Sequence, residues 1–271
     1  MNAEVPNFLC IAVPSVVLFR GAMDLSLQTQ LVIWITFFAA GMVKGVTGMG
    51  LPTVAMGVLG ALISPLSAAS LLLAPSLVTN VWQMAAGTHL APLARRFWPM
   101  VTAIAIGTVF SSGVLARGSS ETTTTALGCA LAAYAAYTLL AGQLTVSPRL
   151  EKTFAPVIGL ATGLVTGATG VLVIPAVPFL QALRLERDEF VQALGMSFTA
   201  STISLTMGLW YFGVLTVEHL PASTLAIVPA LLGMVSGQLL RARISQQLFR
   251  YCFLILMLLL GLEMLLRPLV Q

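Results

Sequence analysis

The stretch GMVKGVTGMG at residues 41–50 returns, altered, as GLVTGATGVL at residues 163–172, and this repetition decides the fold. Each copy interrupts an apolar stretch and is followed by a proline, Pro52 in the first case and Pro175 in the second. Two hydrophobic segments broken by Gly and Pro at corresponding places in two halves are typical of a transporter's binding site. The identical positions, at a constant offset of 122 residues (41 to 163), are Gly41, Val43, Gly45, Thr47 and Gly48, matching Gly163, Val165, Gly167, Thr169 and Gly170.

The composition indicates a protein embedded in a lipid bilayer. Apolar residues make up 58% of the chain and charged residues 8%, against roughly 25% charged in soluble domains. Apolar runs near the length of about 20 residues that a span requires recur at 66–87, 100–116, 126–142 and 248–266. The net charge of +4 comes without a basic face interleaved with aromatic residues, so nucleic acid is not an expected partner.

Periodicity predicts an all-α membrane protein with ten helical elements in two repeats of five. The first repeat occupies residues 28–142 and the second 153–271, with a polar linker at 143–152 and an accessory segment at 1–27. The expected elements are 28–47, 51–63, 67–88, 97–116 and 122–142, then 154–169, 174–183, 190–212, 222–240 and 247–266.

The second element of each repeat is too short to span, because about 13 residues rise only roughly 20 Å against a hydrocarbon core of about 30 Å. We therefore expect each to form a re-entrant hairpin with the helix before it. This arrangement gives the halves inverted topology, both termini outside the cell and a multi-pass place in the cytoplasmic membrane. It collects nine basic residues on the cytoplasmic face, as the charge rule requires: Arg95, Arg96, Arg149, Lys152, Arg184, Arg187, Arg241, Arg243 and Arg250, against Arg20, Arg117 and Arg267 opposite.

The two breaks predict a binding site for a small anionic substrate. Gly48, Gly50 and Gly170 permit the turn and let a ligand approach the backbone. Each following half-helix then directs its N-terminal N–H groups and positive dipole end toward the centre, where an anion is favoured. Thr47 and Thr169 are expected to add hydroxyl donors. The alternative for the earlier glycines, Gly41-xxx-Gly45 and Gly163-xxx-Gly167, is close packing of helices.

Lys44 is the charged residue placed well inside an apolar run. A lysine at that depth is unfavourable by roughly 2.5–3.5 kcal/mol on insertion scales, so we expect it to help hold the anion. The alternative is a side chain that snorkels to the interface. Its counterpart in the second repeat is the neutral Thr166, which makes the predicted site asymmetric in charge.

Amide and hydroxyl side chains in the third element of each repeat complete the candidate site. Asn80 and Gln83 lie one helical turn apart on one face, and Ser197 and Thr199 occupy the matching region of the second repeat. Such groups donate hydrogen bonds to carboxylate or sulfonate oxygens. Hydrogen bonding between helices is the alternative role.

No catalytic, metal or cofactor site is predicted, since the chain has neither a G-x-S-x-G elbow nor an H-E-x-x-H motif. Two rival functions remain open. One is an anion channel; the other is a membrane-embedded sulfur-handling protein that uses Cys10, Cys129 or Cys252, which are spaced for neither a disulfide framework nor zinc. The oligomeric state is left open.

The same residues carry a family resemblance. From residue 28 onward the chain resembles the TauE/SafE sulfite exporter family, also called the toluene-sulfonate uptake permease family. The resemblance implies transport of small sulfur-containing or organic anions, such as sulfite, sulfoacetate or other organosulfonates. The motifs that carry it are GMVKGVTGMGLP at 41–52, PSLVTNVWQ at 75–83, GLVTGATGVLVIPAVPFLQAL at 163–183 and GMSFT at 195–199.

Overall fold

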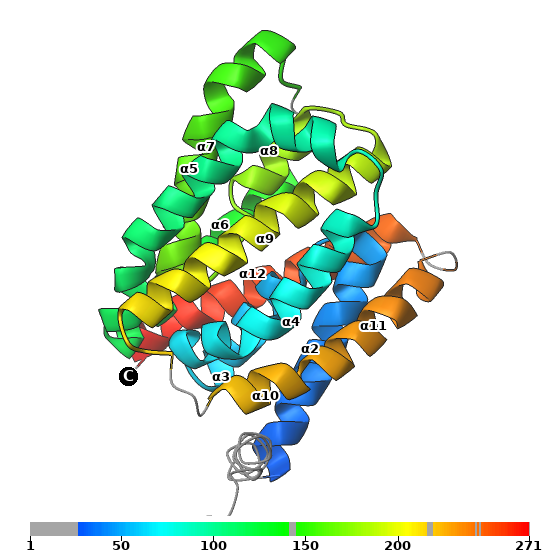
Figure 1. Cartoon of the computed structure of the whole chain (residues 1–271). Helices are drawn as coiled ribbons and strands as arrows, with labels where there is room; N and C mark the ends of the chain where they lie inside the picture. Colours follow the sequence, from blue (N-terminus) through cyan, green and yellow to red (C-terminus); the bar gives the residue numbers. More distant parts are fainter. Residues whose placement is uncertain (1–26, 141–144, 216–218, 242, 244, 271) are drawn as a thin grey trace, which may run out of the picture.

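The computed structural model describes residues 27–140, 145–215, 219–241, 243 and 245–270. This part of the chain contains eleven α-helices and no strand, and they gather into one bundle (Figure 1). Apart from Leu27, the expected accessory segment lies outside the described residues, as do residues 143 and 144 of the expected linker. The helices are α2 (Leu27–Thr47), α3 (Leu51–Leu62), α4 (Pro65–Ala85), α5 (Leu90–Arg117), α6 (Ser120–Leu140), α7 (Pro148–Thr169), α8 (Ala176–Ala182), α9 (Arg187–Tyr211), α10 (His219–Leu225), α11 (Ile227–Leu240) and α12 (Gln246–Val270).

Six stretches of the described residues are long and apolar enough to cross a membrane, which confirms a multi-pass membrane protein. They are α2, α4, α5, α6, the stretch Leu220–Leu240 across α10 and α11, and Phe249–Arg267 within α12. α9 has the length for a span but carries many hydroxyl residues. It packs against α4 and α5, and five of its six serine and threonine residues are buried rather than exposed to lipid.

Both predicted breaks are present. α2 ends at Thr47 and α3 begins at Leu51, with φ of 81° at Gly48 and 106° at Gly50. α7 ends at Thr169, and Gly170 follows with φ of 74°. Glycine adopts these left-handed conformations without the steric penalty of a side chain. The repeated Thr-Gly pair therefore ends a helix in each half, as its sequence predicts.

The half-helix after the second break is shorter than the predicted 174–183. α8 covers only Ala176–Ala182, and Pro175 precedes it instead of lying in its first turn. The residue before a proline is disfavoured in the helical region, which keeps Ile174 outside the helix. Pro52, in contrast, occupies the first turn of α3 as expected.

The predicted element 222–240 is divided into α10 and α11 at Ala226. Pro229 lies three residues further on. Because proline has no backbone N–H and its ring crowds the carbonyl four residues earlier, it removes the hydrogen bond to Leu225. A single uniform helix across this stretch is thereby disfavoured.

After the first break the chain reverses direction: α3 runs opposite to α2 instead of continuing across the bundle. α2 runs in the same direction as α11, and α3 in the same direction as α12. Because α11 and α12, which follow one another in the chain, run in opposite directions (Figure 1), α3 reverses the direction of α2. The approaches that fix these directions are Gly41 to Ala230, Gly45 to Gln238, Gly57 to Met257 and Gly60 to Met264.

The glycine-xxx-glycine pairs pack helices of different halves against each other. A Cβ on Gly45 would lie 2.2 Å from the carbonyl oxygen of Met234 in α11, and one on Gly163 would lie 2.3 Å from that of Ile104 in α5. α2 therefore pairs closely with α11, and α5 with α7. The packing alternative is confirmed for all four of these glycines: Gly41, Gly45, Gly163 and Gly167.

Candidate functional site

The centre of the candidate site is Lys44, in the last turn of α2. Its side chain is only 2% exposed, so the snorkelling alternative is wrong. The ammonium donates to the hydroxyl of Thr79 at 3.1 Å and forms a short hydrogen bond with Oδ1 of Asn80. Lys44 and Asn80, two of the predicted site residues, are thus in direct contact.

Lys44 has neutral partners in the described part of the chain. The ion pairs found there are Arg96–Glu151 and Arg267–Glu263, and neither includes it. An ammonium has three donors, and the two hydrogen bonds above use two of them. A buried charge is strongly unfavourable unless it is paired, so this position is suited to a ligand that carries negative charge.

Asn80 connects the lysine to a polar network between α4 and α9. Its amide nitrogen donates to Ser76 at 2.9 Å and to Thr202 at 3.4 Å, while the two hydroxyls lie 3.2 Å apart. Sequence reasoning did not single out Thr79, Ser76 or Thr202. One signal was available for Ser76, since it lies one helical turn before Asn80, and another for Thr202, which matches Asn80 at the repeat offset of 122 residues.

Gln83 links α4 to the first break. Its amide nitrogen donates to the carbonyl of Gly48 at 2.8 Å and to that of Val191 in α9 at 3.0 Å. Its Oε1 is buried and has no hydrogen-bond partner. The same is true of two hydroxyls, that of Thr53 in the first turn of α3 and that of Ser201 in α9. Buried polar atoms in proteins are normally satisfied, so these three atoms have hydrogen-bonding capacity left for water or a ligand.

The two threonines at the breaks act on the backbone in the same way. The Thr47 hydroxyl lies 2.8 Å from the carbonyl oxygen of Val43 and accepts from the N–H of Met49 at 3.3 Å. Thr169 repeats the arrangement 122 residues later, 2.7 Å from Val165 O and 3.2 Å from Val171 N. Their hydroxyls thus stabilise the turns.

The second break is less open to a ligand than the first. The side chain of Met56 covers Gly170, where a Cβ would lie 2.8 Å from its terminal methyl group. Val171, Leu172 and Val173 are buried around it. Thr166, the counterpart of Lys44, hydrogen-bonds to the carbonyl of Val171 at 3.1 Å.

The hydroxyls predicted in α9 are directed to their own helix. Ser197 donates to the carbonyl of Ala193 at 2.9 Å, and Thr199 to that of Gly195 at 2.7 Å. The structure therefore groups Lys44 with Asn80, and Gln83 with Gly48. It leaves Ser197 and Thr199 with partners of their own.

The alternative of a sulfur-handling protein that uses cysteines finds no cysteine cluster to support it among the described residues. No group of three or more His, Cys, Asp or Glu residues could hold a metal ion there. Cys129 in α6 and Cys252 in α12 are free and exposed on the outer surface of the bundle. Cys10 lies outside the described residues.

Interrupted helices that meet a polar network inside a bundle of apolar helices are the architecture of a membrane transporter. The chain belongs to the family described as Sulfite exporter TauE/SafE, which matches residues 33–264. The resemblance expected from the sequence is confirmed over nearly the whole chain. No curated protein and no solved structure matches it.

Proposed function

We propose that this protein carries a small sulfur-containing or organic anion, such as sulfite, sulfoacetate or another organosulfonate, across the cytoplasmic membrane. The observation that carries the proposal is the buried ammonium of Lys44, held by Thr79 and Asn80 without a carboxylate partner. The transported anion itself supplies the missing negative charge while it is bound. When the anion is released, that negative charge leaves the site with it.

The site lies where the first helix break exposes backbone to the interior. Lys44 and Asn80 supply an ammonium and a polar contact, and Thr53 adds an unpartnered hydroxyl beside the N-terminus of α3. Charge-assisted hydrogen bonds of this kind are roughly twice as strong as neutral ones. In this proposal the first break binds the anion. The second break, with Thr166, Thr169 and Gly170, has a structural role and stabilises the turn between α7 and α8.

The frame of the proposed transporter is a pair of inverted repeats, residues 28–142 and 153–271. Two observations support it. The threonine arrangement at the breaks recurs at the repeat offset, and the matching helices α4 and α9 run antiparallel, since Ser76 contacts Thr202 while Met84 contacts Gln192. Matching helices in inverted repeats run in opposite directions.

The test is Lys44→Met, with Thr166→Val as the control at the matching position of the other half. We expect sulfite binding by the purified transporter to weaken about tenfold to a hundredfold in Lys44→Met, as for loss of a hydrogen bond from a charged group. Thr166→Val should change binding by less than that, since no charge is removed. Lys44→Arg, which keeps the charge, should retain part of the affinity.

Anion affinity is measured by calorimetry in detergent, and flux in liposomes preloaded with unlabelled anion. A folded Lys44→Met variant with unchanged affinity would contradict the proposal. If Thr166→Val weakened binding as much as Lys44→Met does, that result would also contradict the proposal. Stimulation of flux by trapped anion is expected for a carrier, whereas a channel shows none.

A further inference from the structure

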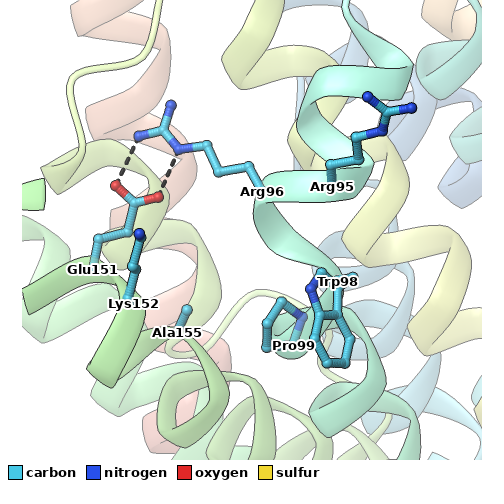
Figure 2. A pocket seen from close by; sticks show the side chains of 7 residues that line it. All are labelled: Arg95, Arg96, Trp98, Pro99, Glu151, Lys152 and Ala155. Atoms are coloured by element: carbon cyan, nitrogen blue, oxygen red, sulfur yellow. Dashed lines mark hydrogen bonds and ion pairs between the residues drawn. The ribbon is translucent and has the colours of Figure 1, made fainter. Parts of the chain in front are cut away.

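A pocket of about 460 Å³ lies between the N-terminal parts of α5 and α7, and none of the residues of the Lys44 network lines it. In Figure 2, Arg96 reaches across the gap from α5 to Glu151 on α7, and Lys152, the next residue of α7, also lines the pocket. Trp98 and Pro99 line the α5 side, and Ala155 lines the α7 side. The pocket therefore combines a charged rim with an apolar wall.

The rim has an excess of positive charge. Arg96 pairs with Glu151 through two hydrogen bonds of 2.6 and 2.8 Å, so the charges of these two side chains balance each other. The bonds use Nε and Nη2, and Nη1 of the guanidinium makes no bond to that carboxylate. Lys152 has no ion pair among the described residues, and Arg95 adds a further cation at the edge. The lining residues comprise three cations and one carboxylate. A second carboxylate, that of Glu189 in α9, acts on Arg96 from beyond the lining, so the rim keeps a net positive charge.

Below this rim the bundle surface is apolar and exposed. Trp98 is 62% exposed, Val157 on α7 60% and Ile106 on α5 66%. Tryptophan favours the level of lipid headgroups, where its ring is buried and its N–H meets polar groups. The sequence of surfaces along α5 and α7, cationic and then aromatic and then aliphatic, matches the profile of a phospholipid from headgroup to acyl chain.

We propose that this pocket binds the phosphate headgroup of an anionic phospholipid, with its acyl chains lying along α5 and α7. Lys152 and the free edge of Arg96 donate to the phosphate oxygens, while the indole of Trp98 packs at the level of the glycerol backbone. A zwitterionic headgroup brings its own ammonium into a rim that is already positive, so an anionic lipid is preferred. Basic pockets between membrane helices bind anionic headgroups in this way.

The bound lipid links the two predicted halves of the chain, because Arg96 belongs to the first repeat, Lys152 ends the predicted linker at 143–152, and Ala155 belongs to the second repeat. The inference does not depend on anion transport through the centre. The two sites share no residue.

The experiment compares Lys152→Gln with Arg250→Gln, an exposed arginine of α12 outside the pocket. Affinity of the whole purified protein is measured by native mass spectrometry against phosphatidylglycerol, phosphatidylcholine and glycerol 3-phosphate. We expect phosphatidylglycerol to bind most tightly, and Lys152→Gln to weaken it about fivefold, the effect of one basic residue near a lipid surface. Arg250→Gln should bind like the unmodified protein.

The controls separate this site from other anion sites. Lys44→Met should keep its affinity for phosphatidylglycerol, so failure of the central site leaves this result intact. Binding of glycerol 3-phosphate as tight as that of the lipid would mean a site for soluble phosphate and overturn the lipid assignment. Equal weakening in Lys152→Gln and Arg250→Gln, or equal binding of phosphatidylcholine, would overturn the pocket itself.

Discussion

Lys44 keeps its ammonium inside the bundle, held by a hydroxyl and an amide oxygen. Such neutral partners stabilise the charge without cancelling it. The same lysine beside a carboxylate would form a closed ion pair and attract no further anion. The neutrality of Asn80 is therefore as important to the proposed site as the charge of Lys44.

This reasoning predicts the effect of Asn80→Asp. The new carboxylate lies beside Lys44 and repels an incoming anion, and close like charges cost several kcal/mol. We expect sulfite affinity to fall by at least about tenfold, while the thermal stability of the ligand-free protein is kept or raised. Asn80→Ala removes the amide without adding charge and should lower affinity less. Affinity in Asn80→Asp equal to that of the unmodified protein would remove Lys44 from the site.

At this scale the sequence identified Lys44, Asn80 and Gln83 as individual candidates but not their contacts. Depth in an apolar run indicates that a lysine is buried, whereas its partner depends on how α2 crosses α4. The hydroxyls of Thr47 and Thr169 were expected to point at the ligand. They turn to the backbone because a threonine at a helix end readily bonds the carbonyl four residues earlier.

Helix pairs in this bundle approach through glycine, and this gives a prediction for whole elements. In Gly45→Ala the new methyl group would lie 2.2 Å from the Met234 carbonyl oxygen, which forces α2 and α11 apart. Overpacking of this kind typically destabilises by about 1–3 kcal/mol. Gly57→Ala is the matched control, because its Cβ would meet Leu131 at an ordinary 3.4 Å.

Unfolding of both variants in detergent, followed by temperature or by added SDS, measures the effect. Gly57→Ala should be neutral or slightly stabilising, since alanine favours a helix by about 1 kcal/mol over glycine. Equal stability of the two variants would show that the α2–α11 contact tolerates separation.

The existence of most elements could be predicted from apolar runs and Gly/Pro signals, although α5 begins at Leu90 instead of 97 and α7 at Pro148 instead of 154. α2 and α3 begin and end within one residue of their predicted bounds. The pairing of α2 with α11 and of α5 with α7 could not be predicted, because it joins residues far apart in the chain. The late start of α8 and the division at Ala226 follow from local proline geometry that a hydropathy profile does not register.

The predicted topology collects the basic residues on the cytoplasmic face, and the orientation of the whole molecule is a further prediction. The connection before α7 is expected in the cytoplasm and the connection between α5 and α6 outside. In a variant without the three cysteines, Ser147→Cys should resist a membrane-impermeant maleimide in intact cells, and Ser119→Cys should react with it. Both serines precede helices in turns of the described chain, α7 and α6 respectively. The opposite labelling pattern would reverse the assigned topology.

The pairing of α2 with α11, a helix made late in the chain, also has a consequence during synthesis. α2, with Lys44 near its end, leaves the ribosome long before α11 is made. The surface formed by Gly41 and Gly45 therefore lacks its α11 partner during most of synthesis. Until α11 is made, the lysine enters the bilayer without the finished bundle around it. Nascent chains halted before α11 should therefore be preferred substrates of membrane quality-control proteases.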